Sequence, residues 1–166
     1  MSTPAASGDA DEVTRRNRAE RVGELALAQG RTIAVAESLT GGMIASALAQ
    51  AQQASEWFRG SLVAYSTLVK HQLLEVPDGP VVSSDAAAAM ARSARKLLLA
   101  DVSVAVTGAG GPSAQDGHEP GTVFLAVDGG GDREQVLCLN LPGEPTAVCA
   151  AATLAALNAL VSTLDQ

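Results

Sequence analysis

One short segment places a lysine one helical turn after a serine, a spacing that suits acid–base chemistry. Ser66 is placed to begin a helix, Lys70 follows it at position i+4, and Tyr65 precedes the pair. A lysine near the mouth of a partly desolvated site has a lowered pKa and can act as a base. The alternative interpretation is a helix cap followed by a solvated lysine, and the spacing alone leaves both open.

Two glycine-rich segments each follow an apolar run that predicts a buried strand. The first is Glu37-Ser38-Leu39-Thr40-Gly41-Gly42, and the second is Thr107-Gly108-Ala109-Gly110-Gly111-Pro112. In open α/β sheets, ligands bind beyond the carboxyl ends of the strands. Glycine lets the backbone approach a ligand closely, and the N–H groups that begin a helix at Gly41 and Gly42 suit an anion such as phosphate. Alternatively, Thr40 only caps a helix and the glycines only turn the chain.

Better-known nucleotide and metal motifs do not match. Residues 108–111 do not spell G-x-G-x-x-G, and Pro112 with a polar loop follows them instead of an apolar helix. The chain has no G-x-x-x-x-G-K, and the Ser66–Lys70 spacing differs from the S-x-x-K of β-lactamases. We expect no metal and two buried free thiols, because no metal-ligand spacing joins the cysteines and histidines, Cys138, Cys149, His71 and His118.

The elements around these segments alternate between helix and strand. In chain order the patterns predict helix 12–29, strand 32–36, a helix from Met43, strand 57–65, helix 66–74, helix 86–99, strands 101–106, 122–127 and 134–141, and a last helix from Pro145. Such alternation predicts an α/β three-layer sandwich, with a mostly parallel sheet and helices on both faces. The last two strands are separated by a short Gly-rich turn and predict an antiparallel edge hairpin.

Composition and charge narrow the class of protein. The net charge is −7 with only 11 Lys and Arg, which opposes the phosphate neutralisation that nucleic-acid binding needs, so we expect no nucleic-acid partner. The polar start lacks the apolar core of a signal peptide, and no stretch approaches the roughly 18 continuous apolar residues of a membrane span. We therefore expect a cytoplasmic protein without a membrane partner, with a disordered tail over residues 1–11 and a single domain over residues 12–166.

Four blocks of sequence resemble the C-terminal domain of the competence/damage-inducible protein CinA, which also occurs as a standalone nicotinamide mononucleotide deamidase. The blocks are AESLTGGMIASAL, RGSLVAYSTLVKHQLLEVP, VSSDAAAAMA and AVTGAGGPSAQDGHEPGTVFLAV, in the family's order and spacing. The resemblance runs over residues 20–127, and four blocks together are more specific than any one alone. The larger CinA protein has an N-terminal domain without a counterpart here, so we expect the standalone form.

The resemblance implies an amidohydrolase without metal or cofactor that converts nicotinamide mononucleotide to nicotinate mononucleotide and ammonia. The family's conserved serine falls on Ser38, its lysine on Lys70 beside Tyr65, and its Thr or Ser before the second glycine loop on Thr107. The matching blocks also imply substrate-binding residues, namely Glu37, Thr40, Gly41, Gly42, Arg59, Gly108, Gly110 and Gly111. The expected partner is a small nucleotide substrate, and the expected assembly is a homo-oligomer such as a dimer.

Amide hydrolysis needs a nucleophile, a base that takes its proton, and donors for the tetrahedral oxyanion. Ser38 would be the nucleophile and Lys70 the base, with N–H groups of the glycine loops as the oxyanion hole. Thr107 and Tyr65 would hydrogen-bond the proton relay or the carboxamide. Whether Ser38 attacks directly or positions a water stays open. We predict that Ser38, Lys70 and Thr107 line one pocket at the carboxyl end of the sheet.

The start of the last helix departs from the family pattern. The family often has G-D-R-x-x-[VI]-R there, whereas Pro145 and Cys149 stand at the two arginine positions of this chain. Leu39 and Thr67 are smaller departures, from Cys and Asn respectively. Arginine is favoured for binding phosphate. Two alternatives to an active deamidase therefore stay open: a non-catalytic relative that binds a nucleotide or a partner, and an amidohydrolase of another small amide.

Overall fold

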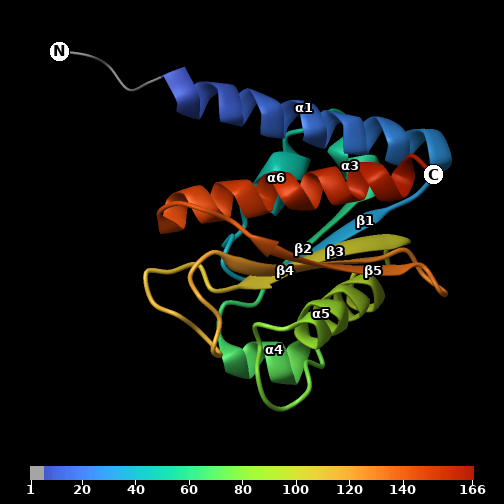
Figure 1. Cartoon of the computed structure of the whole chain (residues 1–166). Coiled ribbons are helices and arrows are strands. Elements are labelled where there is room, and N and C mark those ends of the chain that lie inside the picture. Colours follow the sequence, from blue (N-terminus) through green and yellow to red (C-terminus); the bar gives the residue numbers. More distant parts are fainter. Residues whose placement is uncertain (1–5) are drawn as a thin grey trace.

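A five-stranded sheet with the strand order β2-β1-β3-β4-β5 forms the middle layer of the computed structural model, which describes residues 6–166 (Figure 1). The elements are α1 (Ala6–Gln29), β1 (Ile33–Glu37), α2 (Met43–Ala49), α3 (Ala54–Trp57), β2 (Phe58–Val63), α4 (Thr67–Leu73), α5 (Ser84–Leu97), β3 (Val102–Gly108), β4 (Thr122–Asp128), β5 (Glu134–Asn140) and α6 (Pro145–Leu164).

The direction of the strands decides where a site can form. β1 runs parallel to both β2 and β3, whereas β4 is antiparallel to β3 and to β5. The carboxyl ends of β1, β2 and β3 therefore meet at one end of the sheet. The predicted α/β sandwich, with its parallel strands and antiparallel edge hairpin, is confirmed.

Helices cover both faces of the sheet, as expected. α1 and α6 lie side by side on one face, and α4 and α5 lie on the other (Figure 1). Alternate side chains of β3 divide between the two cores: Val104 and Val106 pack toward α1 and α6, and Ala105 packs toward α5. This alternation follows from the period of two along a strand.

Small side chains allow the layers to pack closely. The inner face of α5 is built almost entirely of alanine around Met90. On the other face, Gly23 of α1 lies so close to the Trp57 ring that a Cβ on the glycine would be 2.9 Å from it. Large aromatic side chains are thus hardly needed, which fits the 2% aromatic content.

The first helix begins earlier than the sequence indicates. α1 starts at Ala6, so the prediction of a disordered tail is wrong over residues 6–11, which are helical. Asp9 lies in its first turn, where a negative charge is favourable to the helix dipole. Residues 1–5 of the predicted tail lie outside the described residues.

α6 is the one helix of the described chain that is long and apolar enough to cross a membrane by length and composition. Its buried side chains, such as Leu157 and Leu160, belong to the core between α1 and the sheet. The core helix of a soluble protein passes the same test, so this helix is weak evidence for a membrane span.

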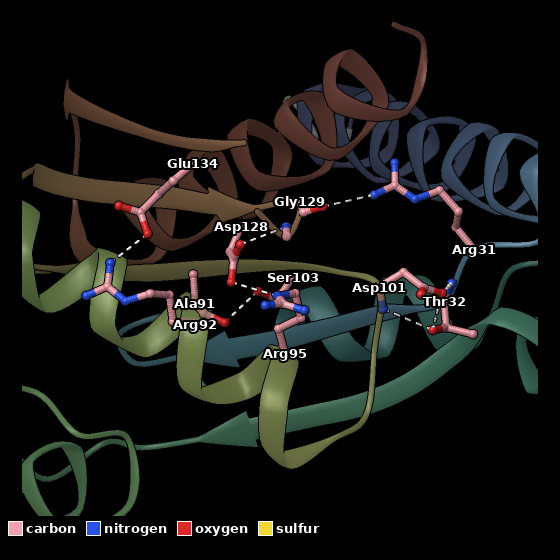
Figure 2. Close-up of polar contacts among 11 residues, drawn as sticks. Arg31, Thr32, Ala91, Arg92, Arg95, Asp101, Ser103, Asp128, Gly129 and Glu134 are labelled. Atoms are coloured by element: carbon pink, nitrogen blue, oxygen red, sulfur yellow. Dashed lines mark hydrogen bonds and ion pairs between the residues drawn. The ribbon is translucent and has the colours of Figure 1, made fainter. Parts of the chain in front are cut away.

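Polar contacts fasten the end of the sheet where β1 and β3 begin (Figure 2). The Asp101 carboxylate accepts hydrogen bonds of 2.8 Å from both the N–H and the hydroxyl of Thr32. On the α5 side, Arg95 pairs with Asp128 at 2.7 Å. These contacts hold together the end of the sheet where β1 and β3 begin. The loops that follow the three parallel strands lie at the opposite end.

Candidate active site

A pocket of about 390 Å³ lies at the end of the sheet where β1 and β3 finish. It is lined by residues from four segments: Ser38 and Leu39 after β1, Tyr65 and Lys70 around the start of α4, the loop residues Gly108, Gly110, Gly111, Pro112, Ser113, Ala114 and Gln115 after β3, and Pro145 and Cys149 of α6. The predicted pair Ser38 and Lys70 therefore lines one pocket.

Ser38 directly follows the last residue of β1. Within the strand Ala36 packs toward α5, and the Glu37 carboxylate bonds to the first turn of α2, so Ser38 begins the turn that leads from the strand to that helix and lines the pocket there. The Ser38 side chain is 6% exposed, and its Oγ has no hydrogen-bond partner among the described residues. A hydroxyl at the pocket wall without a competing partner is available to a ligand.

Lys70 is buried on the inner side of α4. Ser66 caps that helix as predicted, because its hydroxyl accepts a 3.1 Å hydrogen bond from the Val69 N–H. The Lys70 side chain is only 2% exposed, and its Nζ donates one long hydrogen bond of 3.4 Å to the Tyr65 carbonyl. The solvated-lysine alternative is wrong for this structure.

Burial lowers the pKa of Lys70 from its ordinary value of 10.5, because desolvation disfavours the ammonium form. The Asp116 carboxylate acts in the opposite direction and raises this pKa, but burial is the larger effect. Asp116 was not among the predicted site residues; it is held by hydrogen bonds from the N–H groups of Val81 and Val82 at 2.8 and 2.9 Å. The sequence places it 46 residues from Lys70, so only the fold reveals the pairing.

Tyr65 lines the pocket with its side chain 72% exposed at the mouth. Its phenol makes no hydrogen bond within the described chain, whereas its carbonyl accepts from Lys70. Tyr65 thus contacts the site in two ways, through a backbone oxygen that holds the lysine and through a ring free to meet a ligand.

The second glycine loop supplies backbone donors. Ala109 exchanges hydrogen bonds with Thr122 and Gly121 at the base of the loop, which holds its position. Beyond that point the N–H groups of Gly110 and Gly111 have no hydrogen-bond partner among the described residues. Two unpartnered N–H groups on a pocket wall are what an oxyanion hole requires.

Gly108 has a packing role as well as a place in the pocket wall. A Cβ at this position would be 2.8 Å from the Thr122 carbonyl oxygen and 2.8 Å from a methyl group of Val123. Only glycine lets β3 and β4 approach so closely at this end of the sheet.

Thr107 does not line the pocket, so the three-residue prediction is wrong in this part. Its side chain is buried, and its hydroxyl donates a 2.6 Å hydrogen bond to the Val81 carbonyl. The same segment binds Asp116 through its N–H groups. Thr107 therefore anchors the segment whose N–H groups hold the Asp116 carboxylate, and it does not itself line the pocket.

The first glycine loop is not an open anion site. The Glu37 carboxylate is fully buried and accepts hydrogen bonds from the Thr40 hydroxyl at 2.8 Å and from the Gly42 N–H at 3.2 Å. It also accepts from Ile44 and Ala45 in the first turn of α2, at 2.9 and 3.0 Å.

These contacts correct the predicted substrate-binding role of the first loop. The N–H of Gly41 is bonded to the Ser38 carbonyl at 3.0 Å, and none of Glu37, Thr40, Gly41 and Gly42 lines the pocket. The protein's own carboxylate occupies the helix start that a phosphate would need. These residues instead fix the turn on which Ser38 lies.

Arg59 is also not part of the pocket. It is the second residue of β2, and β2 is parallel to β1 with Phe58 opposite Ile33, the first residue of β1. Arg59 therefore lies at the amino end of the parallel strands, close enough to Asp101 to lower the pKa of that carboxyl, although hydrogen bonds from Thr32 lower it more. Arg59 is close to Tyr65 and Lys70 in the sequence, but the fold places it at the other end of the parallel strands.

The two positions at the start of α6 do face the pocket. Pro145 and Cys149 both line it. The Cys149 thiol donates a 3.1 Å hydrogen bond to the Leu39 carbonyl, and burial raises the pKa of the thiol, so it stays protonated near neutral pH. This wall of the pocket is consequently without charge. The prediction of buried thiols is wrong for Cys138, which is exposed on β5, and Cys149 is only half-buried. Among the described residues no group of three or more Cys, His, Asp and Glu side chains is arranged to hold a metal ion.

Comparisons with known proteins agree with this fold and this set of loops. The family model of the CinA C-terminal domain matches residues 15–164. A competence-damage inducible protein of Shouchella clausii (strain KSM-K16) is 44% identical over 126 residues, which are 73% of this chain and 30% of the relative. One of Streptococcus gordonii is 38% identical over 147 residues, 85% of this chain and 35% of the relative. The chain thus spans about a third of the length of these curated relatives.

Solved structures match over nearly the whole chain. A competence-damaged protein (CinA) superfamily protein of Escherichia coli has a TM-score of 0.84 at 31% identity, covering 98% of this chain and 94% of that one. A competence/damage inducible protein of Agrobacterium tumefaciens has a TM-score of 0.86 at 28% identity, covering 92% and 96%. Because the family model covers most of the residues and these folds coincide, the chain belongs to the CinA C-terminal domain family.

Proposed function

We propose that this protein is an amidohydrolase that converts the carboxamide of nicotinamide mononucleotide to a carboxylate and releases ammonia. The observation that carries the proposal is the juxtaposition of Ser38 and Lys70 in one pocket, with a hydroxyl that has no hydrogen-bond partner among residues 6–166 and a lysine side chain that is buried. Membership of the family supports the proposal of an amidohydrolase. The choice of nicotinamide mononucleotide as the substrate is inferred from the resemblance of the four sequence blocks. The names of the relatives specify no reaction.

The chemistry follows from these groups. Neutral Lys70 takes the proton of Ser38, or of a water held by Ser38, as the oxygen attacks the amide carbon. The N–H groups of Gly110 and Gly111 stabilise the oxyanion that forms. The protonated lysine then returns a proton to the departing nitrogen, which leaves as ammonia. When Ser38 itself attacks, this step leaves an acyl ester on its oxygen, and a water that Lys70 deprotonates cleaves the ester to give the carboxylate and restore the serine hydroxyl. Overall, one water and one amide give one carboxylate and one ammonium ion.

The positions of the Ser38 hydroxyl and the Lys70 amine are those expected of an enzyme without bound substrate. No hydrogen bond joins Ser38 Oγ and Lys70 Nζ directly. Catalytic hydrogen bonds are often long in unliganded enzymes and shorten in the substrate complex, and a water can bridge the two groups. The lowered pKa of Lys70 increases the fraction of neutral amine near neutral pH. These features favour turnover over the alternative of a non-catalytic nucleotide-binding protein.

The test is release of ammonia and of nicotinate mononucleotide from nicotinamide mononucleotide by the purified protein. Ser38→Ala should lower turnover on the order of 10³-fold or more, the scale seen when a nucleophilic serine is removed. Ser46→Ala is the matched control, because Ser46 is an exposed serine of α2 outside the pocket. Folded wild-type protein that binds the nucleotide and releases no ammonia would support the non-catalytic alternative and overturn the proposal.

A further inference from the structure

We propose that this site does not recognise the phosphate of the nucleotide, and that a pyridinium carboxamide nucleoside without a phosphomonoester is turned over at least as efficiently. The inference rests on the proposed function, because it names the substrate class of the same pocket. It follows from three features of the structure, which concern the cations, the helix N-terminus and the carboxylates around the pocket.

The pocket holds a single cationic side chain. Of the lining residues, all of which are described, only Lys70 carries a basic group. That group is buried and serves as the proposed base, so it must be neutral when it acts. A phosphomonoester is usually bound through charge-assisted hydrogen bonds, most often from arginine. Arg59 lies at the other end of the parallel strands and offers no such bond.

The helix that begins beside Ser38 offers no anion site. Binding at a helix start uses free N–H groups together with the helix dipole. In α2 the Glu37 carboxylate accepts from Gly42, Ile44 and Ala45 and so occupies that position. A phosphate would have to displace a buried carboxylate that is part of the same turn.

The surroundings of the pocket are acidic. Asp116 is close enough to Lys70 to raise the pKa of the lysine. Glu144 directly precedes the pocket residue Pro145, and proline at that first helical position has no N–H to donate. Glu119 precedes Pro120, which packs beside Gly111 of the pocket wall. Asp116 thus acts on a pocket residue, and Glu119 and Glu144 lie in segments that border the pocket. Negative charge there disfavours a phosphate dianion and favours the positive ring of an N-ribosyl nicotinamide.

The experiment measures kcat/KM for ammonia release from nicotinamide mononucleotide, nicotinamide riboside and free nicotinamide. We expect the riboside to equal or exceed the mononucleotide, and free nicotinamide, which lacks the ring charge, to be the poorest of the three. If the mononucleotide exceeds the riboside by 10-fold or more, the inference is overturned and the amidohydrolase proposal stands. If none of the three releases ammonia, the amidohydrolase proposal itself fails.

A second measurement tests the same point from the side of the protein. Cys149→Arg places a guanidinium on the uncharged wall and should lower KM for the mononucleotide by about 10- to 100-fold, with little change for the riboside. Cys138→Arg, on the exposed strand β5 outside the pocket, makes the same change of charge and should alter neither KM. Equal shifts of KM for both substrates in Cys149→Arg would contradict the inference.

Glu144→Gln provides a second test of the inference that can be used if the Cys149→Arg variant does not fold. Glu144 is exposed and makes no side-chain cap hydrogen bond, so its removal should leave the fold intact. We expect it to lower KM for the mononucleotide more than for the riboside, and more strongly at low ionic strength. An unchanged ratio of the two KM values at low ionic strength would contradict the proposed repulsion.

Discussion

The carboxylate of Glu37, the last residue of β1, accepts a 2.9 Å hydrogen bond from the N–H of Ile44 in the first turn of α2. The same carboxylate also accepts from Ser61 of β2 at 3.0 Å. One buried anion therefore joins two strands to a helix start, and the turn between them carries Ser38. The position of the proposed nucleophile depends on this carboxylate.

Glu37→Gln should destabilise the protein by about 3 kcal/mol. The amide keeps one acceptor oxygen, but its NH2 group then faces backbone N–H donors, and the favourable charge at the helix start is lost. Urea unfolding followed by circular dichroism measures the change in the free energy of unfolding. Glu134→Gln is the control, because it breaks an exposed ion pair with Arg92 and should cost less than about 1 kcal/mol. Equal losses in the two variants would show that the carboxylate is not needed.

Lys70→Arg should lower turnover on the order of 10²-fold or more, because arginine keeps the positive charge and is not deprotonated near neutral pH. The measurement is kcat for ammonia release by protein whose circular dichroism spectrum matches the parent. Lys96→Arg, at an exposed position of α5, controls for the substitution itself. Full activity in Lys70→Arg would assign the base to another group.

Asp116→Asn should move the rise of kcat/KM with pH to lower pH. The base must be neutral to act, so activity increases as pH rises through the pKa of Lys70. Asp116 raises that pKa, and removing its charge lets burial lower it further. Asparagine keeps an oxygen for Val81 and Val82 and tolerates the positive φ of 50° at this position. A pH profile that does not move, or that moves to higher pH, would contradict this role of Asp116.

The sheet could be predicted from the sequence because its signals are local. Apolar runs, glycine-rich turns and the helix patterns between them give the strands, and the short turn after β4 gives the antiparallel edge. The start of α1 could not be predicted, because residues 6–11 are small and polar and lack apolar periodicity.

The site could be predicted where a local pattern marks a strand end or a helix start. Ser38 follows a strand, Lys70 lies one turn after the helix cap Ser66, and both line the pocket. Arg59 was misplaced because nearness in sequence does not fix which end of a strand a residue occupies. Glu37 was misplaced because its partner is decided by the packing of α2 against the sheet.

The last prediction concerns the cost of burying the proposed base. The pKa of Lys70 is lowered in the folded protein, so the unfolded chain, with the ordinary value of 10.5, binds its proton more readily. Stability should therefore rise with pH in the interval between the lowered value and 10.5, and at neutral pH this lysine destabilises the fold. Lys70→Met keeps the length of the side chain and removes the charge.

We expect Lys70→Met to raise the free energy of unfolding at pH 7 while abolishing ammonia release. The gain should shrink as pH rises from the lowered pKa through 10.5, above which the lysine is largely neutral in both states, and urea unfolding at several pH values measures this. Lys96→Met at the exposed position should show no such gain. Stability that falls in Lys70→Met at every pH would mean that the amine makes favourable contacts that outweigh its burial, and that its proton is not readily lost.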